Sequence, residues 1–169
     1  MIPSPSLLRG RCIMKALSIF VAFAALLIAP MASARDAGIA TTIRAMADGF
    51  NKGDIAAVKA LHVVDPTIVD NVAPFVWSGG GSFDKWLGDL GKSEAAAGKS
   101  DGQVWFGDSV DEQVSGDQAY VVAPCRYTYK QGGKTMREEG FIALVMVRVG
   151  AAWKIASWSW ASPAGVAAK

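Results

Sequence analysis

Apolar residues recur with helical spacing in the segment 36–52. Its apolar positions are Ile39, Ile43, Met46, Ala47 and Phe50. Residues three or four positions apart share one face of a helix, so the pattern predicts an amphipathic helix over 36–52. Gly53 follows directly and can end this helix in the left-handed conformation.

The next segments are short. Asp54 can cap a helix over 55–62, and Asp65–Pro66 predicts a break after that helix. The β-branched run Thr67–Val69 favours a strand, and another short strand is expected over 75–77.

A third helix is predicted over 83–97. Ser82 is a favourable N-cap, Asp84 complements the helix dipole in the first turn, and Gly98 can end the helix. Its buried face is expected to consist of Phe83, Trp86, Leu87 and Leu90.

From residue 101 onward the pattern changes to the alternation typical of strands. Glycine-containing turns at 115–117, 132–133 and 150 separate four predicted strands. These strands are 104–116, 118–130, 135–150 and 152–162. Residues 162–169 are expected to form a flexible tail.

The strand over 135–150 is apolar on both faces. Phe141 and Val145 share one face, and Ile142 and Leu144 lie on the other. A strand with two apolar faces is covered on both sides. Because only three helices are available, we expect the second cover to be another subunit, in a homodimer formed through the sheet.

The first 34 residues have the pattern of a secretory signal peptide. Lys15 precedes the apolar run 16–29, and Ala32–Ser33–Ala34 is a small-residue cleavage site. The run is shorter than the roughly 20 apolar residues of a membrane-spanning helix, although an uncleaved anchor is the alternative. The translation start of the natural protein is expected at Met14. The sequence therefore predicts a periplasmic or secreted protein with no stable membrane span after cleavage.

Cleavage would change the charge of the chain. It removes three of the 17 basic residues (Arg9, Arg11 and Lys15) and none of the 15 acids, leaving a formal net charge of −1. Without a basic stripe or run, nothing indicates nucleic acid as a partner.

The cysteine and histidine counts limit the possible chemistry. Cys125 would be the single cysteine left after cleavage, so no intramolecular disulfide can form, and we expect it to be a buried core residue. With one histidine and no cysteine pair, no metal site is predicted, and no cofactor is expected.

Five short motifs occur in a characteristic order: FNKGD (50–54), DPTIVD (65–70), WSGGGSFDKWL (77–87), YKQGGKT (129–135) and WKIASWSW (153–160). In this order and spacing the sequence resembles the nuclear transport factor 2-like superfamily, in its SnoaL-like and ketosteroid-isomerase-like branch. The resemblance covers one domain over 35–161. It implies an α+β fold, in which a cone-shaped, curved antiparallel β-sheet wraps around three N-terminal helices and leaves a pocket at the wide end. Many members of this superfamily are dimers.

The resemblance also implies a candidate base. In ketosteroid isomerases a general-base aspartate ends the strand that DPTIVD matches, and Asp70 takes that position. Met46 falls at the family's oxyanion tyrosine, and Phe141 falls near its protonated acid. The sequence thus departs from the family at both oxyanion donors, which argues against isomerase chemistry because such donors supply several kcal/mol of stabilisation.

The candidate site has catalytic and ligand-binding members. Asp70 is the candidate base and His62 a candidate proton shuttle; the alternatives are a strand-end Asp bonded to backbone amides and a helix-end His bonded to carbonyls. The candidate ligand-binding residues are Trp77, Trp86, Tyr127, Tyr129, Glu139, Phe141, Trp158 and Trp160. For the tryptophans the alternative is core or interface packing.

A group of charges has two interpretations as well. Arg126, Arg137, Glu138 and Glu139 lie on otherwise apolar strands. They could form cross-strand ion pairs or hold a charge in the pocket.

Three functions are compatible with these features. The first, which we favour, is a periplasmic or secreted domain that binds a small apolar or aromatic molecule without catalysis. The second is an isomerase, dehydratase or hydrolase that uses Asp70 as its general base. The third is a dimeric interaction or accessory module whose pocket is filled by its own side chains.

Overall fold

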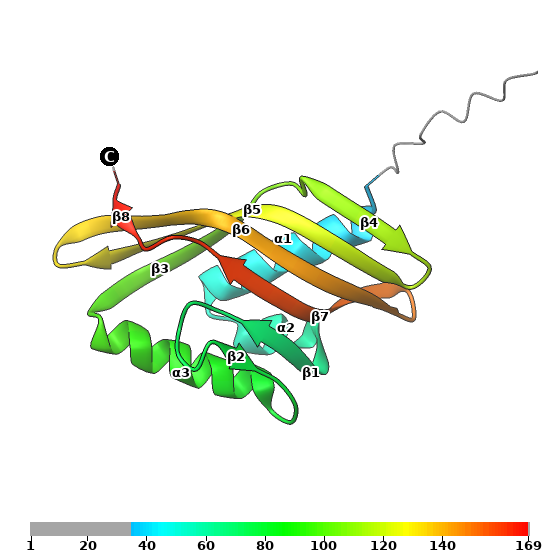
Figure 1. Ribbon diagram of the computed structural model, residues 1–169, viewed down its shortest axis with the longest axis horizontal. Coiled ribbons are helices and arrows are strands. Elements are labelled where there is room, and N and C mark those ends of the chain that lie inside the picture. Colours follow the sequence, from blue (N-terminus) through cyan, green and yellow to red (C-terminus); the bar gives the residue numbers. More distant parts are fainter. Residues whose placement is uncertain (1–34, 169) are drawn as a thin grey trace, which may run out of the picture. The chain divides into compact units, whose positions relative to one another are not determined.

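The computed structural model describes residues 35–168, in which three helices pack against an eight-stranded sheet (Figure 1). The sheet is curved and open, as the predicted α+β cone requires. One feature of the prediction is wrong: the sheet is mixed, because β1 (His62–Val69) pairs in parallel with β7 (Ala152–Ala161). The signal-peptide prediction for 1–34 lies outside the described residues.

The first two helices follow from their caps. The Asp36 side chain accepts a hydrogen bond from the Gly38 amide at the start of α1 (Ala37–Lys52), and Gly53 ends the helix with a φ of 70°. The Asp54 side chain caps α2 (Ile55–Ala60) in the same way. The apolar stripe of α1 is buried as predicted, including Ile39, Ile43 and Met46.

The second helix is shorter than the predicted 55–62, and His62 begins β1 instead of ending a helix. Pro66 does not lie in a break between the helix and the strand, as predicted from Asp65–Pro66. It lies within β1, where the pairing with β7 shifts register between His62 and Thr67. A register irregularity allows a strand to contain a proline, which cannot donate to the ladder. β2 (Val76–Trp77) then pairs with the end of β1.

The third helix, α3 (Ser82–Ala96), begins at the serine that was predicted to precede it. Ser82 is not the N-cap. Gly81 takes that position with a φ of 73°, and the buried Ser82 hydroxyl donates to the Pro66 carbonyl at 2.6 Å. The hydroxyl therefore fastens the start of α3 to β1. Gly98 follows the helix with a φ of 64°.

The sheet has the order β2-β1-β7-β6-β5-β3. Its centre is the long antiparallel pair β5 (Gln118–Gln131) and β6 (Lys134–Val149), which is joined at a Gly132–Gly133 turn. The predicted strand 104–116 is two strands, β3 (Lys99–Phe106) and β4 (Asp111–Ser115), both of which pair with β5. Residues 107–110, between β3 and β4, are not part of a strand.

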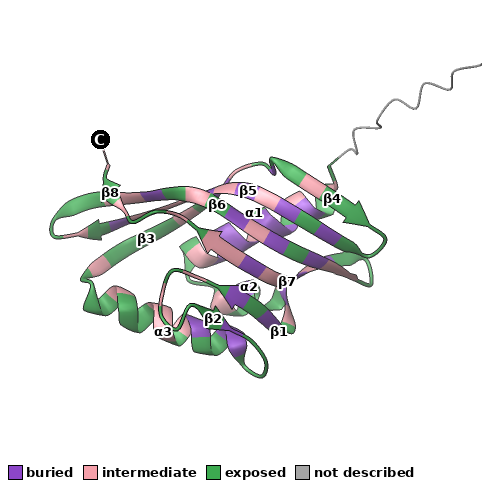
Figure 2. Cartoon of the chain, viewed as in Figure 1, coloured by how far each residue is buried: buried purple, intermediate pink, exposed green. Residues whose placement is uncertain are grey.

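The alternating residues of β6 separate an inner from an outer face (Figure 2). Ile142, Leu144 and Met146 are buried on the inner face, in the hydrophobic core that includes α1. Phe141 and Val145 lie on the outer face and remain 50% and 40% exposed. The strand is thus apolar on both faces, and the described chain covers one of them.

The C-terminal segment contains a short strand, β8 (Val166–Ala167), which pairs with β6 at Met136 and Arg137. The flexibility of the tail over 162–169 stays a prediction. Within residues 35–168, no helix combines the length and the apolar character needed to cross a membrane.

Candidate ligand-binding site

A cavity of about 370 Å³ lies between α1, α3, the loop after β1 and the inner face of the sheet. Most of its wall is aromatic or aliphatic. These wall residues include Phe50, Trp86, Leu90, Phe106, Trp158 and Trp160. The volume lies in the range of about 300–1,000 Å³ that is typical of small-molecule sites.

Trp86 is the centre of the aromatic wall. Its ring centroid lies 4.9 Å from that of Trp158 and 5.8 Å from that of Phe50, both in edge-to-face arrangements. These contacts join α3, β7 and α1. The cavity is therefore bordered by a packed aromatic cluster and not by loosely held side chains.

Asp70 lies at the end of β1, on the border of this cavity. Its Oδ2 accepts a hydrogen bond of 2.8 Å from Trp86 Nε1, and its Oδ1 accepts one of 2.7 Å from the Asn71 amide. Burial raises the pKa of the Asp70 carboxyl, against these hydrogen bonds, and the negative charges of Glu138 and Glu94 raise it further. Asp70 thus combines a fixed orientation with an environment that disfavours its charge.

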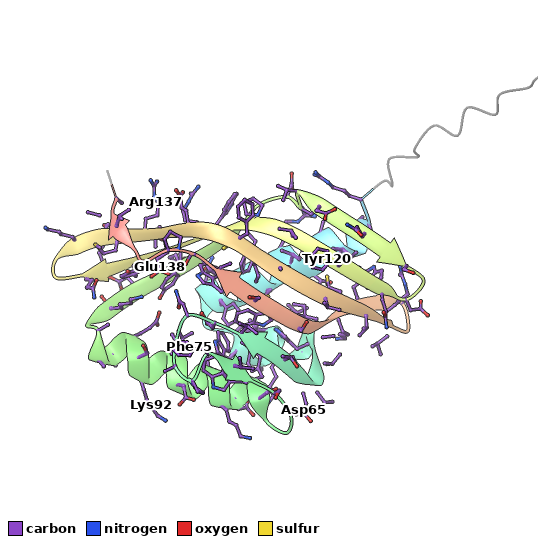
Figure 3. The ribbon with its side chains drawn as sticks, viewed as in Figure 1. Asp65, Phe75, Lys92, Tyr120, Arg137 and Glu138 are labelled. Atoms are coloured by element: carbon purple, nitrogen blue, oxygen red, sulfur yellow. The ribbon has the colours of Figure 1, made fainter. Side chains whose placement is uncertain are left out.

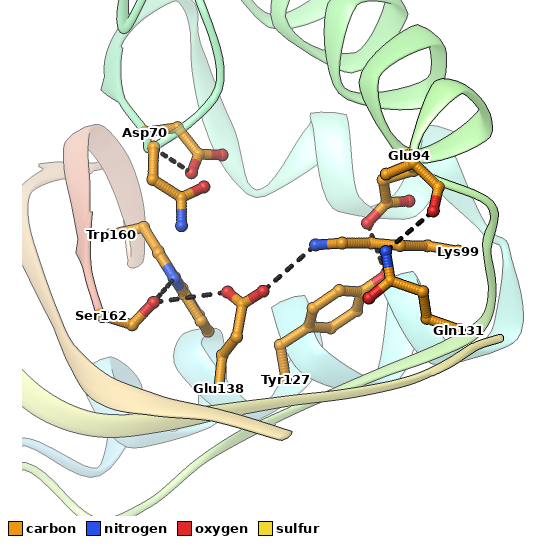
Figure 4. Close-up of polar contacts among 10 residues, drawn as sticks. Asp70, Glu94, Lys99, Tyr127, Gln131, Glu138, Trp160 and Ser162 are labelled. Carbon is orange, nitrogen blue, oxygen red and sulfur yellow. Dashed lines mark hydrogen bonds and ion pairs between the residues drawn. The ribbon is translucent and has the colours of Figure 1, made fainter. Parts of the chain in front are cut away.

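A second polar group on the cavity wall is an ion pair across two strands (Figure 4). Lys99 Nζ on β3 lies 3.1 Å from Glu138 Oε1 on β6, and the Glu138 side chain is almost completely buried. The same ammonium lies 4.1 Å from the centre of the Tyr129 ring. Ser162 donates to the other Glu138 oxygen at 3.4 Å and accepts from Trp160 Nε1 at 2.7 Å.

The third polar group is Tyr127. Its hydroxyl donates to Glu94 Oε1 at 2.5 Å and so joins β5 to α3. Burial and the neighbouring carboxylate raise the pKa of the Tyr127 phenol. The hydroxyl proton is therefore already directed at Glu94, and the phenol is not free to donate to a ligand.

Comparisons with known proteins support the fold by structure and not by sequence. No protein-family model matches the chain, and no curated protein matches it. Solved structures do. An NTF2-like protein of unknown function from Shewanella oneidensis MR-1 is 19% identical, with a TM-score of 0.53 over 72% of this chain and 94% of that protein. The chain has the nuclear transport factor 2-like fold.

Two further structures with this fold are similar. A ketosteroid isomerase-like protein from Erwinia carotovora atroseptica SCRI1043 is 20% identical, with a TM-score of 0.55 over 73% of this chain and 92% of that one. An NTF2-like protein with a cystatin-like fold from Novosphingobium aromaticivorans is 16% identical, with a TM-score of 0.54 over 72% and 77%. At these identities the likeness shows a shared fold and no shared activity.

Within this NTF2-like fold, the structure brings half of the predicted site residues together. Those that border the cavity are Asp70, Trp86, Tyr127, Trp158 and Trp160. Those that do not border it are His62, Trp77, Tyr129, Glu139 and Phe141. Their functional roles remain predictions, whereas their positions follow from the strand and helix geometry described above.

His62 is buried against Phe83 of α3 and does not border the cavity. Its Nδ1 is 2.9 Å from the Val58 carbonyl, and its ring lies 4.9 Å from that of Phe83. Burial lowers the pKa of the imidazole. Within residues 35–168, Nε2 has no hydrogen-bond partner. The imidazole therefore has no contact with Asp70 through which it could act as its proton shuttle.

The other residues outside the cavity have identifiable structural roles. Trp77 is buried and donates to Asp89 on α3 at 3.1 Å. Glu139 is exposed and lies 3.0 Å from Arg126, as one of the cross-strand ion pairs that the sequence left open. Tyr129 is stacked on Tyr127 with a centroid distance of 5.2 Å. Phe141 is on the outer face of β6.

Three further residues complete the site: Glu138, which belongs to the group of charges with two interpretations, and Glu94 and Lys99, which the sequence did not single out. Glu138, which is labelled in Figure 3, borders the cavity where Glu139 was expected. The reason is that the even-numbered residues of β6 share the inner face with Ile142. The alternation of apolar residues along this strand was enough to predict that Glu138, and not Glu139, shares the face of Ile142. Lys99 and Glu94 also border the cavity, but they lie where α3 gives way to β3, and the sequence had no periodic signal for them there.

Among the side chains of residues 35–168, no group of three or more His, Cys, Asp or Glu is arranged to hold a metal ion. Cys125 is buried, and burial raises the pKa of its thiol to about 12, which suits a core residue and not a nucleophile.

The site can therefore hold an apolar or aromatic body against tryptophan rings and orient it with a few fixed polar groups. Asp70 could accept a proton, since its pKa is raised. A developing oxyanion would need a donor. The Tyr127 hydroxyl and the Trp160 indole already donate to other groups, whereas Trp158 Nε1 is buried and has no hydrogen-bond partner within residues 35–168.

Proposed function

We propose that this chain is a periplasmic or secreted protein that binds a small, mostly apolar molecule in the cavity bordered by Trp86, Trp158 and Trp160. The observation that carries this proposal is the cavity itself, whose aromatic wall surrounds a small number of oriented polar groups. Such a combination is typical of ligand sites. The open cavity also supports binding over the alternative of an accessory module with a filled pocket.

The proposed location depends on the leader pattern of residues 1–34 and on the composition of the remainder. With one remaining cysteine the chain forms no intramolecular disulfide, so its fold is compatible with an oxidising or a reducing compartment. N-terminal sequencing of the protein recovered from cells would test the predicted cleavage after Ala34.

Native mass spectrometry tests the binding proposal. The protein is expressed with its leader, recovered gently from the periplasm and weighed without denaturation. We expect a reproducible additional mass of a small molecule. Leu90→Trp, which replaces an aliphatic side chain of the cavity wall with a bulky indole ring, should remove that mass.

Val64→Trp is the matched control, because Val64 is 88% exposed and does not border the cavity. It should retain the additional mass. A bare protein that acquires no mass from a broad set of apolar metabolites would contradict the proposal and favour the accessory module.

One observation supports a second candidate, an enzyme that uses Asp70 as its general base: the carboxyl borders the cavity and has a raised pKa. The bound molecule would then be converted over time into a different compound in the presence of the protein, and nuclear magnetic resonance of the extracted ligand would detect the conversion even where the product is an isomer of equal mass. Asp70→Asn would abolish the change and retain binding. A bound molecule that stays unchanged for hours would argue against this candidate.

We further propose that the chain forms a homodimer through the outer face of the sheet. Tyr120, Phe141 and Val145 are exposed there, on neighbouring strands (Figure 3 labels Tyr120). Exposed apolar residues that are contiguous on a sheet favour an interface between proteins.

A further inference from the structure

The cavity wall carries an excess of acidic side chains. Among residues 35–168, the acidic side chains that border it are Asp70, Glu94, Asp101 and Glu138, and Lys99 is the one basic side chain that does so. An apolar surround strengthens every charge interaction within it. We therefore expect the site to discriminate between ligands by the sign of their charge as well as by their shape.

The one basic group is already neutralised. Lys99 is held by Glu138 at 3.1 Å and by the face of Tyr129 at 4.1 Å. Because both partners are fixed on neighbouring strands, the ammonium is not available to an anionic ligand without leaving Glu138 buried and unpaired. Breaking such a pair is strongly unfavourable.

The charge that remains is negative. Glu94 accepts a hydrogen bond from Tyr127, which leaves its charge in place. Asp70 accepts two hydrogen bonds from neutral donors, Trp86 Nε1 and the Asn71 amide. Within residues 35–168, Asp70 has no cationic partner in an ion pair. A carboxylate has about four lone-pair sites, so two remain for a ligand.

The walls around Asp70 suit a cation as well. Trp86 donates to Asp70 and presents its ring to the cavity wall, with Trp158 and Phe50 beside it. Aromatic faces attract organic cations by about 0.5–2 kcal/mol, and more when the site is desolvated. The same faces hold the apolar part of a ligand.

We propose that the cavity selects an organic cation, a protonated amine on an apolar or aromatic body, with its ammonium beside Asp70 and its body against Trp86 and Trp158. This inference rests on the proposed function, since it specifies the ligand of the same cavity. The groups that act on Asp70 are consistent with it: Trp86 and Glu94 on α3, and Glu138 on β6. Lys99 on β3 is paired with Glu138.

Amines and neutral ligands are expected to differ in how their binding affinity depends on pH. The raised pKa of Asp70 reflects burial first and the negative charges of Glu138 and Glu94 after it. A bound ammonium would stabilise the ionised carboxylate and lower this pKa. Amine binding should therefore strengthen as the pH rises through the pKa of Asp70 and should release protons, whereas neutral ligands should show neither effect.

The test uses three compounds of nearly equal shape: tryptamine, tryptophol and indole-3-acetate. They carry an ammonium, a hydroxyl and a carboxylate on the same indole body. The analogous phenyl series is phenethylamine, phenethyl alcohol and phenylacetate. Isothermal titration calorimetry at pH 7 measures each dissociation constant. We expect each amine to bind about tenfold more tightly than its alcohol or better, which corresponds to about 1.4 kcal/mol, and each carboxylate to bind most weakly.

Asp70→Asn should weaken amine binding about tenfold and change alcohol binding less than about threefold. Asp48→Asn is the matched control, because Asp48 is exposed on α1 and does not border the cavity; it should change neither. If Asp70→Asn fails to fold, Glu94→Gln provides the second variant and should weaken amine binding selectively.

The outcomes separate the two proposals. A carboxylate or alcohol that binds as tightly as its amine would overturn the selection of cations and leave small-molecule binding in place. Amine binding that is unaffected by both Asp70→Asn and Glu94→Gln would also overturn it. Six compounds that all fail to bind would count against the inference and the binding function together.

Discussion

At the scale of single residues, the site depends on how charges are held beside apolar groups. Asp70 and Glu138 both border the same cavity, but their environments differ. Glu138 is buried with a cationic partner, whereas Asp70 is half-buried with neutral donors only. A buried charge without a cation is unfavourable for folding, and residues that are retained in such a state often serve binding or catalysis.

Replacement of Asp70 should therefore stabilise the protein. Because its pKa is raised in the folded state above the ordinary value of 3.8, the stability associated with this carboxyl is present below that value and is lost as the pH rises through the folded pKa. Asp70→Asn removes the charge and retains an acceptor for Trp86. We expect a gain of about 0.5–1 kcal/mol in the free energy of unfolding at pH 7.

Urea unfolding of Asp70→Asn at pH 5 and pH 7 provides the measurement, with Asp48→Asn as the control. The gain at pH 7 should be at least as large as the gain at pH 5. A variant that is less stable than the wild type at pH 7 would show that Asp70 is a structural strand-end residue.

His62 should give the opposite dependence on pH. Its pKa is lowered in the folded state, so below the ordinary value of 6.5 the unfolded chain binds a proton that the folded chain does not. Stability should fall as the pH decreases from 7.5 to 5.5, by at most about 1.4 kcal/mol per pH unit. The chain has one histidine, so comparison with a His62 variant isolates the contribution of this imidazole.

Urea unfolding at pH 7.5, 6.5 and 5.5 measures this dependence. His62→Gln should be less stable than the wild type at pH 7.5 and should lose less stability on acidification. An equal loss in both proteins would place the sensitive group elsewhere.

At the scale of elements, the sequence predicted the arrangement better than the boundaries. Helical spacing identified α1 and the buried face of α3, because these stripes are long. The start of β1 was missed because His62 and Val63 follow the helix without a turn signal in the sequence. Ser82 was predicted to be an N-cap because its actual partner, the Pro66 carbonyl, is 16 residues away in the sequence. Local patterns cannot show such tertiary contacts.

The candidate site was predicted in part for the same reason. Asp70 and Trp158 could be found because one ends a recognisable motif and the other shares a strand face with Trp160. Glu139 was chosen as a ligand-binding residue in place of its neighbour Glu138, although the alternation of buried and exposed residues along β6 favours Glu138. Lys99 could not be found, since its role depends on the approach of β3 to β6.

The contact between Ser82 and Pro66 should be important for the position of α3. Ser82→Ala leaves the buried Pro66 carbonyl without its donor, and we expect a loss of about 1–3 kcal/mol in the free energy of unfolding. Ser78→Ala, at an exposed position just before the helix, should cost less than about 0.5 kcal/mol. Chemical denaturation of both variants measures the difference. Equal losses would mean that the hydroxyl of Ser82 contributes nothing specific.

At the scale of the whole molecule, the outer face of the sheet remains to be covered. Val145 is 40% exposed near its centre, between Phe141 and Val149 on the same strand. If this face forms the proposed homodimer, Val145→Lys should place a charge in the interface and increase the dissociation constant at least about 100-fold. Val64→Lys, on an exposed residue of β1, should not.

Light scattering after size-exclusion chromatography, over a range of protein concentrations, reports the subunit count. The wild type and Val64→Lys should be dimers where Val145→Lys is a monomer. A wild-type monomer at high concentration, or a dimer that is indifferent to Val145→Lys, would contradict an interface on this face.

The central claim is that the aromatic cavity is where the protein binds its ligand, and the tryptophan indole resonances test it most directly. Nitrogen-15 spectra would compare protein recovered from the periplasm with the same protein after unfolding, dialysis and refolding. Signals of Trp86, Trp158 and Trp160 should shift, while those of Trp77 and Trp105, which do not border the cavity, should stay. Identical spectra, or shifts at Trp77 and Trp105 alone, would contradict the account.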